Sequence, residues 1–177
     1  MASGAAGAVL ALSAVGLVRY GRHDMPVSIP ELAPDAARAD LIEVRKADRQ
    51  LILSREGRVL RTYRIALGFD PVGHKRQEGD GRTPEGRYII DWRNPQSRFH
   101  LSLHVSYPEA HDVAAAREAG LDPGGDIMIH GQPNGVGWWG WWRQRRDWTV
   151  GCIAVRNAQM REIWALVADG TPVVIRP

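Results

Sequence analysis

The sequence contains a single cysteine, Cys152, and this scarcity excludes two classes of small domain. A lone thiol cannot form an intrachain disulfide, and a zinc site built on cysteines needs several of them. The sequence also lacks a glycine-rich phosphate-binding loop and any zinc-ligand spacing, so we expect no cofactor. The chain must therefore fold by burying an ordinary apolar core.

An excess of charge of one sign is also missing. The chain has 23 basic and 20 acidic side chains, a net charge of +3, and no block of like charges. This balance is too mild for a protein whose main partner is a nucleic acid. Apolar residues make up 44% and charged residues 24% of the 177 positions, which is typical of one globular domain. Disordered, collagen-like and polytopic membrane proteins are excluded.

Long hydrophobic runs are limited to one, residues 4–18. This run is shorter than the roughly 20 residues of a spanning helix, and no basic side chain precedes it as in most signal peptides. We interpret residues 1–24 as an apolar export signal or membrane anchor. A peripheral hydrophobic tail and an ordinary first helix are the alternatives. An exported chain would act outside the cytoplasm.

Prolines separate this apolar run from the remainder of the chain. Pro26, Pro30 and Pro34 each interrupt regular structure. We therefore expect a linker over residues 25–39 and a single domain over residues 40–177.

Short apolar or alternating runs separated by turns predict many short strands in this domain. The expected strands are 41–45, 50–54, 59–68, 87–92, 99–105, 126–130, 152–155 and 171–175. A short helix is expected over 109–119. The fold class is therefore mainly β, as a sandwich-like or barrel-like domain, with one or two short helices.

The clearest helix follows Asn157, which we expect to cap its N-terminus. Apolar residues recur at the spacing of one helix face, at Met160, Ile163, Trp164 and Val167. This stripe predicts that the helix packs against the sheet.

Cys152 is the candidate nucleophile. A free cysteine is more often an inert core thiol, and an intracellular domain with a buried thiol is the plain alternative. Two features favour reactivity. Gly151 lets the backbone approach a ligand, and an unpaired cysteine in an exported chain is unusual.

A thiol nucleophile needs a base, because a free thiol is only slightly ionised. Of six histidines, His130 is the best placed, since it ends the apolar run 127–129 and is followed at once by Gly131. A polar side chain at such a position can face a cleft. A buried structural histidine is the alternative.

These residues resemble the L,D-transpeptidase family with its YkuD-type catalytic domain. The matching pattern is His130-Gly131, a spacer, and the run TVGC at 149–152, with 18 residues (131–148) between His130 and Thr149. The Thr-Pro-x-Gly turn at 83–86 is similar to the family's turn before a strand. Residues 94–103 and the Tyr107-Pro108 pair resemble its murein-acting branch. The resemblance covers residues 40–177.

The resemblance implies acyl transfer on peptidoglycan stem peptides through a thioester on Cys152. His130 would be the base, the Gly131 carbonyl would fix its tautomer, and the amides of Gly151 and Cys152 would bind the oxyanion. An amine acceptor gives transfer, whereas water gives an L,D-carboxypeptidase or amidase-type hydrolase. A non-catalytic cell-wall binding domain is a further alternative. No protein partner is expected, and no nucleic acid.

Four further residues are candidates for substrate binding. Ala154, like Val150, departs from the family's usual residue and would line the acyl pocket. Thr149 either binds substrate or caps the turn. Trp141 and Trp142 belong to a tryptophan cluster over 138–148, which we interpret as a lid over the cleft, as rings packed on the domain, or as a membrane-interface contact.

Overall fold

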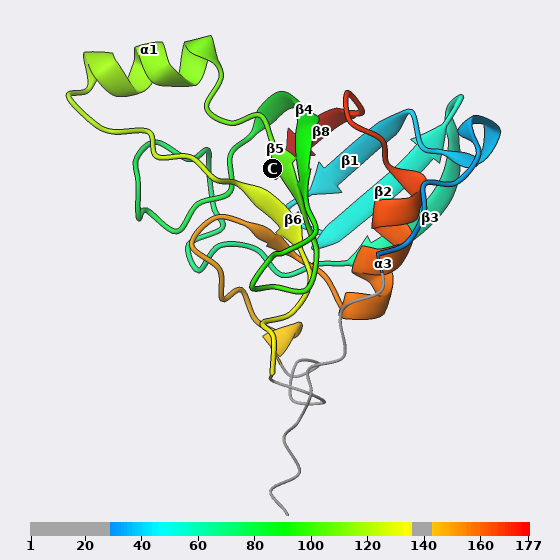
Figure 1. Cartoon of the computed structure of the whole chain (residues 1–177). Helices are drawn as coiled ribbons and strands as arrows, with labels where there is room; N and C mark the ends of the chain where they lie inside the picture. The colour runs from blue at the N-terminus through cyan, green and yellow to red at the C-terminus, as the bar shows by residue number, and fades with distance from the viewer. Residues whose placement is uncertain (1–28, 136–142) are drawn as a thin grey trace, which may run out of the picture.

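The described strands form one curled mixed sheet, seen in a computed structural model that describes residues 29–135 and 143–177 (Figure 1). Its order is β3-β2-β1-β8-β4-β5-β6-β7. The strands are β1 (Leu41–Arg45), β2 (Gln50–Arg55), β3 (Arg58–Arg64), β4 (Gly86–Asn94), β5 (Ser102–Val105), β6 (Met128–His130), β7 (Ile153–Ala154) and β8 (Pro172–Arg176). The helices in this part of the chain are α1 (Ala110–Glu118), α3 (Asn157–Leu166) and a 3-10 turn, Asp35–Ala37.

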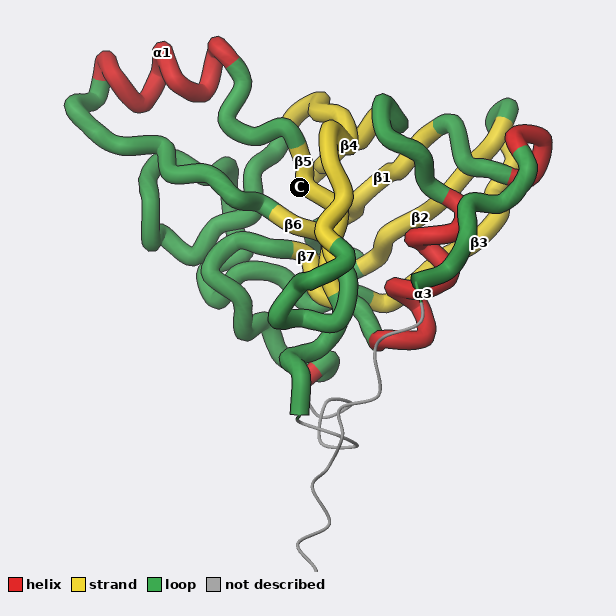
Figure 2. The backbone as a smooth tube through the Cα atoms, in the orientation of Figure 1, coloured by secondary structure: helices red, strands yellow, loops and turns green. Residues whose placement is uncertain are grey.

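Strand β4 joins the two halves of the sheet. Its first residues pair antiparallel with β8, and its last residues pair antiparallel with β5. Neighbouring strands are parallel at β1–β8 and at β6–β7. Figure 2 shows β6 and β7 at one end of this curled sheet and β3 at the other. The mainly β prediction is therefore confirmed.

Several strands are shorter than the sequence predicts, and the backbone gives the reason. The run 99–105 starts as a strand only at Ser102, because His100 has a φ of 73°. The run 126–130 starts only at Met128, because Asp126 has a φ of 53°. Both values lie in the left-handed region, which ends an extended strand.

The run 59–68 also changes partner partway. Strand β3 ends at Arg64, after which Ala66 bridges Ala154 and Gly68 bridges Thr149. This segment therefore leaves β2 and crosses to the residues around Cys152.

Helix α3 buries the predicted stripe of Met160, Ile163, Trp164 and Val167 in the core. The predicted cap is wrong. Arg156 is the N-cap residue, and its N–H donates to the Gln159 Oε1 at 3.0 Å. The side chain of Asn157 has another contact, described below.

The segment expected to be a linker is attached to the domain in its second half. The N–H groups of Ala33 and Ala39 donate to the carbonyls of Ala165 and Leu166, at 2.8 Å each, and Ala39 is buried. Residues 1–24, interpreted above as a signal or anchor, lie outside the described residues. Among residues 29–135 and 143–177, the structure contains no helix with the length and hydropathy of a membrane span.

Candidate active site

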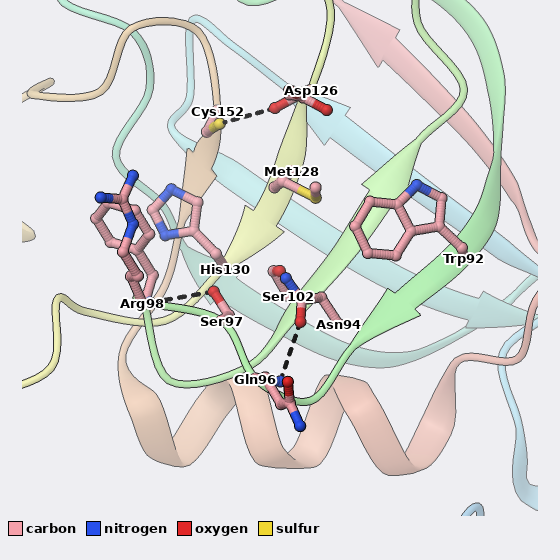
Figure 3. Close-up of a pocket in the computed structure, with 11 residues that line it drawn as sticks. Trp92, Asn94, Gln96, Ser97, Arg98, Ser102, Asp126, Met128, His130 and Cys152 are labelled. Carbon is pink, nitrogen blue, oxygen red and sulfur yellow. Dashed lines mark hydrogen bonds between the residues drawn. The ribbon is translucent and has the colours of Figure 1, made fainter.

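Cys152 and His130 are brought together by the pairing of β6 with β7. His130 lies opposite Ala154 in this parallel pair, and Cys152 precedes Ala154 by two positions. Cys152 directly precedes β7, and an extended backbone with its alternation of two would direct its side chain to the same face of the sheet as His130. Both line a cavity of about 450 Å³ (Figure 3).

A tight turn presents Cys152 at this cavity. The Thr149 hydroxyl donates to the Cys152 carbonyl at 2.7 Å and accepts the Gly151 N–H at 3.2 Å. Gly151 has a φ of 131°, and a Cβ there would lie 2.7 Å from the Arg82 carbonyl oxygen. The turn therefore requires glycine for both its conformation and its space.

The tautomer of His130 follows from its hydrogen bond to the next residue. Its Nδ1 lies 2.7 Å from the Gly131 carbonyl oxygen. Because a carbonyl only accepts, Nδ1 carries the proton and Nε2 is the basic nitrogen. This is the arrangement that the sequence predicts for Gly131.

Burial keeps the His130 imidazole neutral. Only 3% of the residue is exposed, and its ring packs against Phe99 at 4.6 Å and Trp148 at 5.7 Å between centroids. This burial lowers the pKa of His130 to about 4, although its bond to Gly131 acts in the opposite direction. The ring is therefore an unprotonated base at neutral pH.

The Cys152 thiol is neutral for the same reason. Burial raises its pKa, and the Asp126 carboxylate raises it further, whereas the Met128 N–H and the Lys75 ammonium lower it. The thiol Sγ lies 3.5 Å from the Asp126 carbonyl oxygen, which accepts its proton (Figure 3). At rest, a neutral thiol and a neutral imidazole share the cavity.

Two buried glutamines fix the strands that carry this pair. The Gln132 Nε2 donates to the Gln144 Oε1 at 2.9 Å and to the Val155 carbonyl at 2.8 Å. The Gln144 Nε2 donates to the carbonyls of Arg64 and Ala154, at 2.9 and 2.8 Å. The segments after His130 and after Cys152 are thereby tied to each other and to the end of β3.

Asn157 completes this framework from the start of α3. Its Oδ1 accepts the Gln132 N–H at 2.7 Å. The contact leaves no room at Gly131, where a Cβ would lie 2.6 Å from that oxygen and 2.9 Å from the Phe99 carbonyl oxygen. Glycine after His130 is therefore required by packing.

Three residues with predicted roles in the site, Thr149, Gly151 and Ala154, have other contacts in the structure. Thr149 is buried and closes the turn, so its predicted contact with substrate is replaced by the turn-capping alternative. Ala154 is fully buried, exchanges backbone hydrogen bonds with Ala66 and is not among the residues that line the cavity. The Gly151 N–H donates to the Thr149 hydroxyl at 3.2 Å, within the turn.

The predicted lid residues, Trp141 and Trp142, lie outside the described residues. Within the tryptophan cluster, Trp148 is described, and it packs on Phe99 and His130. Its ring covers part of the imidazole and shields it from solvent.

The comparison with known families supports what this geometry suggests. The YkuD family, described as the L,D-transpeptidase catalytic domain, matches residues 39–175. This chain belongs to that family. The sequence-based recognition is therefore confirmed over nearly all of the described domain.

One curated relative is similar to this YkuD domain in sequence, and two solved structures are similar to it in fold. YafK of Escherichia coli K12 is 30% identical over 128 residues, which are 71% of this chain and 44% of YafK. The chain thus spans less than half the length of that relative. The helical cell shape determining protein Pgp2 from Campylobacter jejuni aligns with a TM-score of 0.59 at 23% identity, over 77% of this chain and 46% of Pgp2. Bd1075 of Bdellovibrio bacteriovorus aligns with a TM-score of 0.55 at 24% identity, over 86% and 53%. These two structures support the fold of the YkuD domain.

Sequence reasoning missed several residues of the YkuD site. Asp126 contacts the thiol through its backbone, and the only signal was the Gly124-Gly125 pair before it. Gln132 and Gln144 carried no signal, because a buried amide looks like any exposed one in a sequence. Among the described residues, no group of three or more His, Cys, Asp or Glu side chains is arranged to hold a metal ion.

Proposed function

We propose that this chain is a cysteine acyltransferase that acts on peptidoglycan stem peptides. The observation that supports this most strongly is the shared cavity of Cys152 and His130, in which the imidazole is neutral and its Nε2 is the basic nitrogen. The family provides the substrate class, because L,D-transpeptidases act on peptidoglycan stem peptides. The proposed activity is an L,D-transpeptidation.

The first half of the reaction makes a thioester. As substrate enters, the Cys152 Sγ attacks the carbonyl carbon of the bond that joins an L-centre to a D-residue, and its proton passes to the His130 Nε2. The carbon–nitrogen bond then breaks, and the Nε2 proton goes to the departing amine. The acyl part of the stem peptide stays on Cys152.

The second half releases the thioester. An acceptor amine attacks the thioester carbonyl and loses its proton to the His130 Nε2, and the thiolate leaves and recovers that proton. This gives a new peptide link. Water in place of the amine gives a carboxylate, which is hydrolysis.

The oxyanion role falls to the backbone amide of Cys152. The Gly151 amide donates to Thr149, so we assign the oxyanion contact to the Cys152 N–H, which is on the same residue as the attacking Sγ. The Gly131 carbonyl holds the imidazole through Nδ1 and stabilises the positive charge that forms on the ring.

Peptidoglycan lies outside the cytoplasm, so we propose an extracytoplasmic location. Residues 1–24 would serve as the export signal or membrane anchor. A fusion reporter that is active only in the cytoplasm would contradict this location.

The test is incubation with a purified disaccharide-tetrapeptide and mass spectrometry of the products. We expect crosslinked dimers or exchanged D-residues from the wild type, and no product from Cys152→Ala at an unchanged melting temperature. His130→Gln should lose turnover, because it lacks the base. His111→Gln, at an exposed histidine on α1, is the matched control and should remain active. Turnover by Cys152→Ala contradicts the proposal. Trimming without transfer identifies a hydrolase that uses the same thioester.

A further inference from the structure

Trp92 has an unusual position in the cavity that contains Cys152 and His130. Figure 3 shows it across the cavity from Cys152, with Met128 between them in that view. The residue is 40% exposed, whereas Tyr88 and Ile90, which precede it at intervals of two on β4, are buried. A regular strand would have turned all three toward the same face.

A β-bulge at Asp91 explains the exposure. Ile90 pairs with Val105 and Trp92 with His104, so β4 contains one more residue than β5 between these pairs. The extra residue inverts the alternation, which moves Trp92 from the core face to the cavity face. Bulges of this kind re-aim side chains beside functional sites.

The His104 ring supports the Trp92 indole on one of its faces. The His104 ring stacks on it with centroids 5.3 Å apart and an interplanar angle of 24°. The His104 Nδ1 lies 2.6 Å from the Asp91 Oδ1, so the bulge residue itself fixes the supporting ring. One face of the indole is covered by His104, and its exposure therefore belongs to its other face and edge.

Neutral polar groups also line this cavity. Asn94 and Gln96 line the same cavity, and the Asn94 Oδ1 accepts the Gln96 N–H at 3.0 Å, which fixes the turn after β4. Of the charged lining residues, Asp126 contacts Cys152 through its backbone carbonyl, and Arg98 is on the His130 side of the cavity in Figure 3, away from Trp92. The cavity lining thus combines an exposed indole with two neutral amide side chains.

We propose that Trp92, Asn94 and Gln96 form a subsite for a pyranose ring of the glycan strand that carries the stem peptide. The apolar C–H face of a sugar stacks on an indole, and its hydroxyl and acetamido groups bond to amides. This subsite would hold the sugar at one end of the cavity while the peptide extends to Cys152 at the other. The inference rests on the proposed function, because it assumes a glycan-linked substrate.

Kinetics on two substrates test the subsite. We compare a disaccharide-tetrapeptide with the free tetrapeptide for the wild type, Trp92→Ala, Trp92→Phe and the control Ile89→Ala. Ile89 is on the same strand and is 42% exposed. Trp92→Ala should raise the KM for the disaccharide-tetrapeptide about tenfold, leave kcat unchanged and leave the free tetrapeptide unaffected, with partial recovery in Trp92→Phe. Equal effects on both substrates, or none on either, overturn the subsite.

Binding of the sugar alone separates this inference from the proposed reaction. GlcNAc–MurNAc without peptide is titrated into Cys152→Ala and into Cys152→Ala/Trp92→Ala, and saturation-transfer NMR reports contact. Contact in the single variant that is lost in the double variant supports the subsite even if no turnover is found. Equal signals in both, or none in either, overturn it. A wild type that turns over neither substrate contradicts the proposed function instead.

Discussion

At the scale of residues, the surroundings of Cys152 and His130 disfavour a thiolate–imidazolium ion pair before substrate binds. Burial lowers the pKa of the imidazole and raises the pKa of the thiol, so the proton stays on sulfur until a substrate arrives. The thiolate would then form together with the bond to the substrate carbonyl. Such a site protects its thiol from adventitious alkylation and oxidation, both of which need the thiolate.

The Asp126 carboxylate contributes to this protection. Asp126→Asn should lower the pKa of Cys152, because the negative charge that raises it is gone. Iodoacetamide should therefore label the thiol several-fold faster at pH 7.5, and the pH profile should move to lower pH. Labelling reports this one site, since Cys152 is the only cysteine.

Asp122→Asn is the control for this experiment, because Asp122 is not among the groups that shift the Cys152 pKa. An unchanged or higher pKa in Asp126→Asn would show that the carboxylate does not act on the thiol.

At the scale of elements, the site depends on buried amides that join segments remote in sequence. Gln144 is the centre, since it bonds to Gln132 and to the carbonyls of Arg64 and Ala154. It connects the end of β3 with β7 and with the segment after β6. Neither β6 nor β7 is long enough to fix its own register.

Gln144→Ala should therefore lower both stability and turnover. The change removes three hydrogen bonds, those to the Arg64 carbonyl, the Ala154 carbonyl and the Gln132 side-chain amide, at a cost of about 2–4 kcal/mol in the free energy of unfolding. Urea unfolding measures this cost, and kcat on the disaccharide-tetrapeptide should fall in the protein that remains folded. Gln77→Ala, at an exposed glutamine, is the control and should change neither. A loss below 0.5 kcal/mol for Gln144→Ala contradicts a positioning role.

The sequence predicted the elements that depend on local pattern. Alternating residues predicted β1 and β2, and the stripe from Met160 to Val167 predicted α3. His130 was found because it ends an apolar run and precedes a glycine, and Cys152 because it is the single thiol and follows a glycine. The resemblance to the L,D-transpeptidase family then joined the two.

What the sequence could not predict depends on contacts between distant segments. Asn157 is a good N-cap residue, but its oxygen bonds to Gln132 instead. Trp92 reads as a core position by alternation, and only the pairing with β5 reveals the bulge that exposes it. Ala154 was expected to line the acyl pocket because of its place in the family's motif, and the structure shows it fully buried and bridged to Ala66.

At the scale of the whole molecule, a buried neutral histidine makes the fold sensitive to acid. The pKa of His130 is about 4 when folded and about 6.5 when unfolded. The unfolded chain therefore binds a proton first as the pH falls. The stability that this depressed pKa contributes is complete above pH 6.5 and is lost progressively down to pH 4.

From pH 7 to pH 5, this linkage should cost about 2 kcal/mol of folding free energy. His130→Gln removes the titrating group, so its loss of stability over the same interval should be about 2 kcal/mol smaller than that of the wild type. Urea unfolding at both pH values gives the difference, in which the contributions of all other groups cancel. Equal losses would mean that His130 is not kept neutral by the fold.

The mass of the intact protein during turnover shows directly whether Cys152 is the nucleophile. Wild-type protein mixed with a disaccharide-tetrapeptide and quenched in acid should carry the disaccharide-tripeptide acyl group, with the D-residue lost and the adduct located on Cys152 by peptide mapping. Hydroxylamine should remove it, as expected for a thioester, and Cys152→Ala should carry none. Product formation without any adduct, or an adduct on another residue, would contradict the central claim that Cys152 is the nucleophile.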